Sequence, residues 1–439
     1  MTAQGEVLPD GWRFDRLKDI VPEIAGGGTP ASANADFWDD GDIVWVTPTD
    51  FSKTGNGERI YDSERKITQA GLASCAAELL PENTVIMASR ATIGPVRIAG
   101  TELATNQAFV SFVCDEIKLH HRFLSYVVIG YLGDYFAEIA PGTTFREISR
   151  GEAKLESIKF PRLSEQQRIA AYLDASCAAI DAAVAAKRRQ LETLDALRKS
   201  IVHCAITKGL NPNAPMRPSG VTWFGEIPRH WRCEHLKRFT TRIQAGMTPP
   251  TNTPEYYFDG TIPWFAPGSF DGEIDLHEPR KLINELARSD GELRIFPAGT
   301  VFLVGIGATI GKVGLISTEA SCNQQLLGFV CGHRMDSRFL AHQFKIYEGV
   351  IPDIATATTL PIFDQVKAGY LPTLQPPREE QKLICTFLDN KLAESKKIIA
   401  GIESQLATLT AYRKSLIHEC VTGQRRITEA DVQRVQSHG

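Results

Sequence analysis

The stretch Gly41-Asp42-Ile43-Val44-Trp45-Val46-Thr47-Pro48 returns 219 positions later as Gly260-Thr261-Ile262-Pro263-Trp264-Phe265-Ala266-Pro267. Glycine, isoleucine, tryptophan and proline stand at the same places in both stretches. Further pairs keep the same or a slightly smaller offset: Trp12 and Trp231, Gly27 and Gly246, Thr29 and Thr248, Asn106-Gln107 and Asn323-Gln324, Glu165-Gln166 and Glu380-Gln381. A nearly fixed offset over so many residue types indicates a duplicated domain and predicts a pseudo-twofold molecule.

The first part of each copy has the pattern of a mixed α+β domain. Short runs rich in β-branched and aromatic residues, bounded by Gly, Pro and Asn, predict strands. These runs lie at 42–46, 84–87 and 108–113, and again at 261–265, 300–304 and 326–331. Apolar segments at 123–131 and 339–347 are predicted to be helices. We therefore expect a β-rich mixed domain of about 160 residues in each copy.

The second part of each copy predicts one long helix. Residues 164–206 contain neither Gly nor Pro, and apolar or small residues recur three or four positions apart, as they do again from Ile384 to Cys420. An uninterrupted helix over 164–206 would be roughly 60 Å long. We favour an antiparallel coiled coil in which the two helices pair as a spacer, with one ordinary bundle per copy as the alternative. The seam residues Leu191, Leu194, Leu406 and Leu409 are expected at a subunit interface.

A polar, Pro-rich connector at 208–220 marks the seam between the copies. The expected organisation has four parts. They are a mixed domain at 1–160, a long helix at 161–210, a second mixed domain at 211–375 and a second long helix at 376–439.

The composition is that of an ordinary soluble protein. With 439 residues, 43% of them hydrophobic and 23% charged, the chain can bury several cores. Its continuous apolar runs are far shorter than the roughly 20 residues of a membrane-spanning helix, and its polar start lacks a signal peptide, so we expect a cytoplasmic location without membrane contact. The nine cysteines form no C-x-x-C motif, and Cys114 and Cys331 occupy equivalent apolar positions. We expect reduced core thiols, with no metal site or disulfide.

Charge is unevenly distributed along the chain. Residues 1–160 carry 15 basic and 23 acidic side chains, a net charge of −8, whereas residues 161–210 carry 8 and 5, a net charge of +3. A nucleic-acid contact by the first domain must therefore use local basic residues or rely on a partner for its electrostatics.

No catalytic motif is visible. The glycines at 305, 307 and 311 resemble a phosphate-binding loop, but Ile306 and Val313 stand where a P-loop requires glycine and Ser or Thr. We expect a β-turn there. The chain also lacks N-P-P-[YF], D-P-P-Y, H-E-x-x-H and G-x-S-x-G. His203 and His418 match between the copies, but they lie on the long helices without other ligands nearby, so structural roles are expected for both.

A family resemblance accounts for this layout. Two stretches resemble the P-x-x-x-E-Q-x-x-I-x-x-x-L-D start of the conserved helices in type I restriction-modification specificity subunits. The first is Phe160-Pro161-Arg162-Leu163-Ser164-Glu165-Gln166-Gln167-Arg168-Ile169 with Leu173-Asp174. The second is Gln375-Pro376-Pro377-Arg378-Glu379-Glu380-Gln381-Lys382-Leu383-Ile384 with Leu388-Asp389. The openings at 8–12 and 227–231, each followed by a G-x-T-P turn, are similar to that family too. The resemblance covers nearly the whole chain.

The resemblance implies a non-catalytic DNA-binding subunit with two target-recognition domains. Each domain would read one half of a bipartite target in double-stranded DNA, and the helices would set the distance between the halves. Two methyltransferase subunits would dock on the helices and bring S-adenosylmethionine. Restriction subunits that translocate DNA would bring ATP and Mg, so this chain itself would bind no cofactor and no metal.

Polar side chains on turns present in both copies are the candidates for DNA contact, because Arg reads guanine, Asn and Gln read adenine, and Thr contacts phosphate. They are Thr29, Arg90, Thr92, Asn106, Gln107, Thr143 and Thr144 in the first copy, and Thr248, Thr309, Lys312, Asn323, Gln324, Thr358 and Thr359 in the second. Residues shared by two copies that read different sequences are expected to hold the fold, so a structural role is the leading interpretation of Asn106-Gln107. Base-specifying residues are expected where the copies diverge, at 53–66 and 271–281.

Two other functions compete with this interpretation. A single-chain restriction enzyme and methyltransferase would need a catalytic domain of several hundred residues that this sequence does not contain. A duplicated coiled-coil scaffold that binds only protein partners is the alternative that remains, and it would show no DNA sequence preference.

Overall fold

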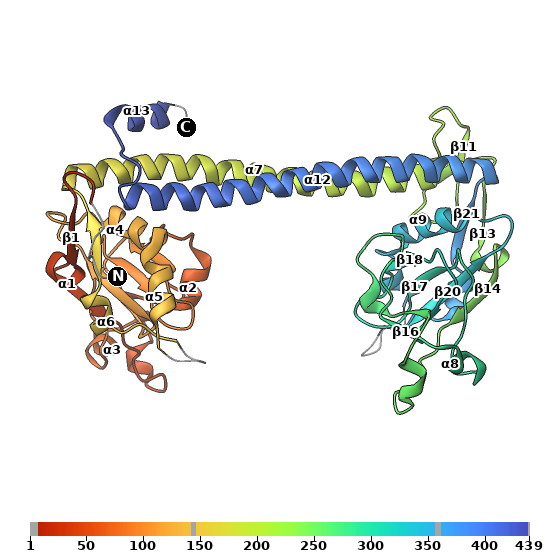
Figure 1. The fold of residues 1–439 in the computed structure, drawn as a ribbon, viewed down its shortest axis with the longest axis horizontal. Helices are drawn as coiled ribbons and strands as arrows, with labels where there is room; N and C mark the ends of the chain where they lie inside the picture. The colour runs from red at the N-terminus through yellow and green to blue at the C-terminus, as the bar shows by residue number, and fades with distance from the viewer. Residues whose placement is uncertain (1–7, 142–145, 356–360, 438–439) are drawn as a thin grey trace. The chain divides into compact units, whose positions relative to one another are not determined.

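The computed structural model describes residues 8–141, 146–355 and 361–437. The chain forms two compact units, Met1–Arg188 with Glu403–Gly439, and Arg189–Ile402. Each unit combines one mixed domain with one part of each long helix, α7 (Leu163–Lys208) and α12 (Arg378–Val421) (Figure 1). The expected α+β class with two long helices is confirmed.

The first unit is built on three sheets. The largest has the order β2 (Glu23–Gly26), β9 (Phe109–Val113), β6 (Val85–Ala88), β7 (Val96–Ala99) and β4 (Arg59–Ile60). The second has the order β5 (Lys66–Ile67), β3 (Ile43–Val46) and β8 (Ala104–Thr105), and the third pairs β1 (Arg13–Arg16) with β10 (Ser157–Phe160). The strands expected at 42–46, 84–87 and 108–113 are therefore present.

The second unit repeats this plan. Its sheets are β14 (Thr240–Ala245), β20 (Leu326–Cys331), β17 (Val301–Val304) and β18 (Val313–Leu315); β16 (Lys281–Ile283), β15 (Ile262–Phe265) and β19 (Ser321–Cys322); and β13 (Arg232–His235) with β21 (Pro372–Gln375). A hairpin of β11 (Met216–Pro218) and β12 (Glu226–Pro228) forms in the connecting segment. The largest sheets differ in one strand, because β4 of the first unit is replaced by a single bridge between Asp275 and Leu315 in the second.

Short helices cover the sheets. In the first unit α4 (His121–Val127) continues through a π-helical turn into α5 (Gly133–Ile139). The apolar run 123–132 in this segment is buried at almost every position. In the second unit α9 (Ser337–Tyr347) takes the place of α4. Both helices lie beside the long helices of their own unit (Figure 1). The remaining short α-helices are α1 (Leu17–Ile20), α2 (Pro48–Lys53), α3 (Gln69–Ala73), α6 (Arg150–Leu155), α8 (Glu285–Ser289), α10 (Ile351–Ile354), α11 (Gln365–Gly369) and α13 (Glu429–Ser437).

The long helices pack antiparallel within each unit. In the first unit Asp181 of α7 bonds Arg413 of α12 at 3.0 Å, and Ile180 shares a core with Ile417. In the second unit Ile206, near the end of α7, shares a core with Ile384, near the start of α12. The antiparallel pairing expected from the apolar stripes is confirmed, and one separate bundle per copy is wrong.

All nine cysteines are free thiols. Burial raises the pKa of Cys331 to about 11 and, with nearby acids, raises that of Cys385 to about 12, so both thiols stay protonated at neutral pH.

Among the described residues, α7 alone is long and apolar enough to cross a membrane, since one 18-residue window has a mean hydropathy of 1.5. The sequence shows no long apolar run there because alanines supply much of this hydropathy. The same test is passed by packed helices of soluble proteins, and Asp174 and Asp181 on α7 pair with Arg122 and Arg413.

Candidate functional site

The Glu-Gln pair at the start of each long helix clamps that helix to its mixed domain. The buried Gln166 amide donates to the carbonyls of Lys118 and Pro161, each at 2.9 Å, and accepts from the His120 N–H at 2.9 Å. Gln381 does the same with Arg334 and Pro376 at 2.9 and 2.8 Å, and accepts from the Asp336 N–H at 2.7 Å.

The glutamate of each pair holds a tryptophan indole. Trp12 donates to Glu165 at 3.4 Å, and Trp231 donates to Glu380 at 3.1 Å. The motif residues that the sequence analysis tied to the family therefore have a common mechanical task. They fix the start of the long helix against the opening of the mixed domain.

The two G-x-T-P turns are also built alike. Gly27 packs so closely that a Cβ there would lie 2.0 Å from the Asn106 carbonyl oxygen, and Gly246 meets the carbonyls of residues 322 and 323 in the same way. Thr29 donates to the Gln107 side chain at 2.5 Å, and Thr248 donates to Gln324. The Trp45 indole donates to the Gly28 carbonyl at 3.0 Å, as Trp264 does to Met247.

Several candidate contact residues are thus brought together in pairs. Thr29 and Gln107 are exposed, as are Thr248 and Gln324. Each pair therefore lies on the surface, and its two side chains bond each other. Asn106 accepts from the Ala108 N–H, and the buried Asn323 likewise accepts from the Gln325 N–H and also donates to the Gln325 side chain. These bonds support the structural interpretation of the asparagines, and DNA contact by any of these residues stays a prediction.

Arg90 and Thr92 lie on the turn between β6 and β7. The Arg90 guanidinium is 3.4 Å from the Glu147 carboxylate and 44% of its side chain is exposed. The equivalent turn between β17 and β18 carries Thr309, which is exposed, and Lys312, which donates to the Phe270 carbonyl at 3.4 Å. The expected β-turn at 305–312 is confirmed. The candidates Thr143, Thr144, Thr358 and Thr359 lie outside the described residues.

The long helices carry four other candidate residues, which are predicted to lie at a subunit interface. Leu191, Leu194, Leu406 and Leu409 are all half-buried in the described structure. Each therefore retains some accessible apolar surface, and their place in a subunit interface remains a prediction. The helix histidines have the structural roles expected of them, since His203 lies 3.0 Å from the Trp223 carbonyl and His418 lies 3.2 Å from that of Gly130.

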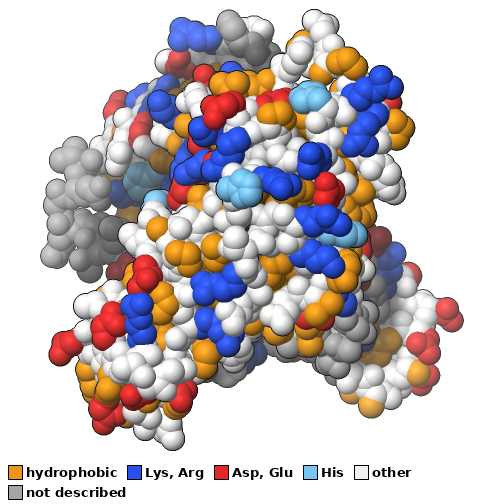
Figure 2. Space-filling view, turned by 90° about the vertical axis from the view of Figure 1, so that its right-hand side faces the viewer, with side chains coloured by type: hydrophobic (Ala, Val, Ile, Leu, Met, Phe, Trp, Pro, Cys, Tyr) orange, Lys and Arg blue, Asp and Glu red, His pale blue; other side chains and the backbone are white. Residues whose placement is uncertain are grey.

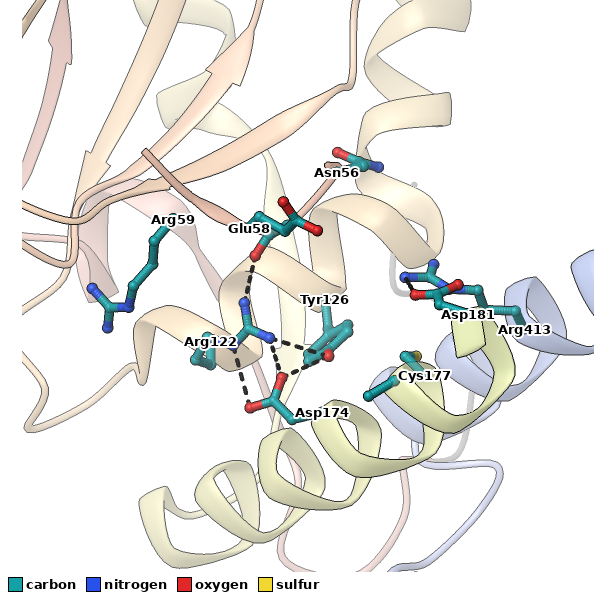
Figure 3. Close-up of a pocket in the computed structure, with 11 residues that line it drawn as sticks. Asn56, Glu58, Arg59, Arg122, Tyr126, Asp174, Cys177, Asp181 and Arg413 are labelled. Atoms are coloured by element: carbon teal, nitrogen blue, oxygen red, sulfur yellow. Dashed lines mark hydrogen bonds and ion pairs between the residues drawn. The ribbon is translucent and has the colours of Figure 1, made fainter. Parts of the chain in front are cut away.

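The structure adds a pair of ion-pair clasps that the sequence analysis missed. In the first unit Arg122 of α4 bonds Asp174 of α7 through two of its nitrogens, and the Tyr126 hydroxyl donates to Asp174 at 2.7 Å (Figure 3). In the second unit Arg338 of α9 and His342 both lie 3.3 Å from Asp389 of α12. The signal was available, because Arg122-Phe123-Leu124 recurs as Arg338-Phe339-Leu340.

The clasps shift the pKa values of their members. Burial disfavours the charge of Arg122, but the hydrogen bond to Asp174 outweighs it and the net pKa is raised. Burial also raises the pKa of Asp389, yet the hydrogen bond from His342 and the charge of Arg338 outweigh it, so the net pKa is lowered. Arg122 and Asp389 are therefore charged at neutral pH.

One group in the described part of the chain could ligate a metal. Ligand atoms of Glu116, His120 and His121 all lie within 4.8 Å of one another. However, the Arg59 guanidinium already lies 3.2 Å from the His121 ring and the Glu116 carboxylate bonds the other nitrogen of that ring at 2.5 Å. The positive charge of Arg59 disfavours a metal cation beside it, so we interpret Glu116, His120 and His121 as a hydrogen-bonded cluster.

Basic side chains gather on one face of the second unit. Lys, Arg and His side chains spread over the upper part of the face seen in Figure 2, toward which β13 lies in Figure 1. The exposed basic residues on β13 and its flanks are Arg229, His230, Arg232, His235, Lys237 and Arg238. The matching segment of the first copy carries Asp10, Asp15 and Asp19 among its basic residues, so the two copies differ in local charge.

Two mixed domains with matching clamps and surface turns, each fixed to a long helix, define a two-part recognition protein. A family model described as the type I restriction modification DNA specificity domain matches residues 9–193 and 239–408. The chain belongs to this family, and it carries the domain twice.

Individual relatives and solved structures are similar to this chain over much of its length. The type I restriction enzyme MjaIX specificity subunit of Methanocaldococcus jannaschii is 25% identical over 96% of this chain and 95% of its own length. The EcoR124I/EcoR124II specificity subunit of Escherichia coli is 29% identical over 34% of this chain and 37% of its own. A chain from a solved type I R-M system matches 95% of this chain and 99% of its own length, with a TM-score of 0.74 at 16% identity. The HsdS subunit of Thermoanaerobacter tengcongensis matches 97% and 100%, with a TM-score of 0.56 at 17% identity.

Proposed function

We propose that this chain is the non-catalytic DNA-reading subunit of a type I restriction-modification complex, and that each mixed domain reads one half of a bipartite target. The observation that carries the proposal is the presence of two domains of this DNA specificity family on identical Trp-Glu and Gln clamps. Sequence differences between otherwise equivalent domains give an asymmetric target, because each domain presents its own side chains to one major groove.

The long helices act as the spacer between the half-sites. Successive major grooves on one side of B-DNA are about 34 Å apart, which is within reach of helices of 46 and 44 residues. Two methyltransferase subunits dock on this chain and supply S-adenosylmethionine, and restriction subunits supply ATP and Mg. The complex works in the cytoplasm, where its DNA substrate is found.

The test is a titration of labelled duplex DNA with the chain reassembled with its methyltransferase partners. A bipartite sequence preference supports the proposal, whereas equal binding to every duplex would favour a scaffold that binds only protein. Sequencing the sites methylated in cells that carry the system would then identify the half-sites and the spacer. The isolated chain, incubated with labelled S-adenosylmethionine and DNA, should transfer no label.

A further inference from the structure

Each ion-pair clasp joins a short helix to a long helix and also holds a third segment of the chain. In the first unit the Arg122 guanidinium also donates to the Gly57 carbonyl at 2.5 Å. In the second unit Arg338 donates to both carboxylate oxygens of Asp275, at 2.8 and 2.9 Å. Gly57 and Asp275 lie in the segments 53–66 and 271–281, where the copies diverge in sequence and where the largest sheets differ in structure.

Crevices separate part of each divergent segment from the long helices, although Ile274 of the second segment packs in the core that contains Ile206 and Leu388. A crevice of about 680 Å³ separates residues 56–59 from α7 in the first unit, and Figure 3 shows Arg122 reaching across it from α4. A crevice of about 770 Å³ lies between residues 272–274 and the long helices in the second unit. Lys345 donates to the Gly272 carbonyl at 2.9 Å, and Lys396 of α12 pairs with Glu273 at 3.0 Å, so polar contacts again bridge the gap.

We propose that Arg122 and Arg338 are positioning residues for base recognition, each fixing the divergent segment of its own copy relative to the long helix. The inference rests on the proposed function, since it assigns base reading to these segments. A guanidinium suits the task because its planar fork can hold the helix carboxylate and the segment at once, in fixed directions. An ammonium group carries its three donors on one nitrogen, so it can pair with the helix carboxylate but cannot also reach the segment as the second guanidinium nitrogen does.

The experiment therefore compares Arg122→Lys and Arg338→Lys in the reassembled complex, with half-site preference measured by selection from randomised duplexes. Arg122→Lys should lower discrimination in the first half-site about tenfold, the range of one well-placed base contact, and leave the second unchanged. Arg338→Lys should do the reverse, so each variant is the other's control. Thermal unfolding should change little in either, because the pair with the helix aspartate is retained.

Two further variants separate positioning from a merely structural role. Asp275→Asn weakens only the segment side of the second clasp and should relax the second half-site as Arg338→Lys does. Arg413→Lys alters the ion pair between Asp181 of α7 and Arg413 of α12, which includes no residue of a divergent segment, and it should leave both half-sites intact.

Unchanged preference in folded Arg122→Lys and Arg338→Lys complexes, or an equal loss across both half-sites, would overturn the positioning role while leaving the proposed function standing. A wild-type complex without any bipartite preference would instead remove the proposed function, and this inference with it.

Discussion

The Gln166 side chain is expected to contribute strongly to the stability of the folded protein. Its buried amide satisfies two carbonyls and one N–H, all close to the start of α7. Gln166→Leu should cost about 3 kcal/mol of unfolding free energy, because those backbone groups stay buried without partners. Chemical denaturation of the full chain measures the loss.

Two variants serve as controls for this prediction. Gln167→Leu changes the exposed neighbour and should be nearly neutral, while Gln381→Leu should repeat the effect in the second unit. Equal stability of Gln166→Leu and Gln167→Leu would contradict the clamp.

Arg90 tests direct base reading at a single position. If it pairs with guanine, Arg90→Ala should weaken binding of the reassembled complex by about 1 to 3 kcal/mol and relax preference at one position of the first half-site. Glu147→Ala releases Arg90 from its partner and should not relax that preference. A uniform loss over all duplexes with a shallower salt dependence would make Arg90 a phosphate contact, and no loss would make it structural.

At the level of single residues, the sequence predicts which side chains recur but not all of their partners. Repetition identified the Glu-Gln pairs and the paired Thr and Gln side chains, but not which groups they bond. The Arg122 clasp depends on a partner 52 residues away, and neither helical periodicity nor a local motif reports such a contact.

At the scale of elements, the clasp of the second unit predicts a response to acid. The pKa of Asp389 is lower in the folded protein than its ordinary value of 3.8, so its contribution to stability is full above that value and is lost as pH falls through the folded value. Asp389→Asn should therefore be less stable than wild type near neutral pH, and the difference should shrink in strong acid. Urea unfolding measured from pH 7 to pH 3 checks this, with the exposed Asp353→Asn as control.

The long helices predict a change in spacing. Four residues inserted in register into α7 lengthen it by about 6 Å, roughly one turn, and should lengthen the preferred spacer while both half-sites stay the same. Sequencing of methylated sites gives the answer. Changed half-sites with an unchanged spacer would exclude the helices as the ruler.

Elements divide clearly into those the sequence predicts and those it does not. The Gly- and Pro-free run at 164–206 falls within α7, and the six apolar runs became strands, because local periodicity and burial agree there. The sequence located the divergent segments 53–66 and 271–281 but did not predict their structure. Arg59 and Ile60 form β4 by pairing with β7, a choice made by tertiary packing that leaves only a single bridge at Asp275 in the other copy.

At the scale of the whole molecule, the duplication predicts exchangeable parts. Replacing residues 12–160 with the matching segment of a relative should change the first half-site alone, because base contacts in one major groove are roughly independent of those one turn away. The methylation pattern of cells carrying the hybrid tests this, with the parental protein as reference. A hybrid that altered both half-sites would show that the domains do not read DNA independently.

The tryptophan clamps have a last consequence for the order of the chain. Gly209, which follows α7, packs against Trp231 of the second copy, and Gly423, which follows α12, packs against Trp12 of the first, both with positive φ. Arg426 adds a bond to the Asp10 carbonyl at 2.9 Å. The glycine that follows each long helix thus meets the opening tryptophan of a mixed domain in the same way at both places. Because the two arrangements match, we expect a circularly permuted chain, opened between 211 and 225 and joined between residues 423 and 12, to adopt the same fold, which circular dichroism and thermal unfolding of the permuted protein would check.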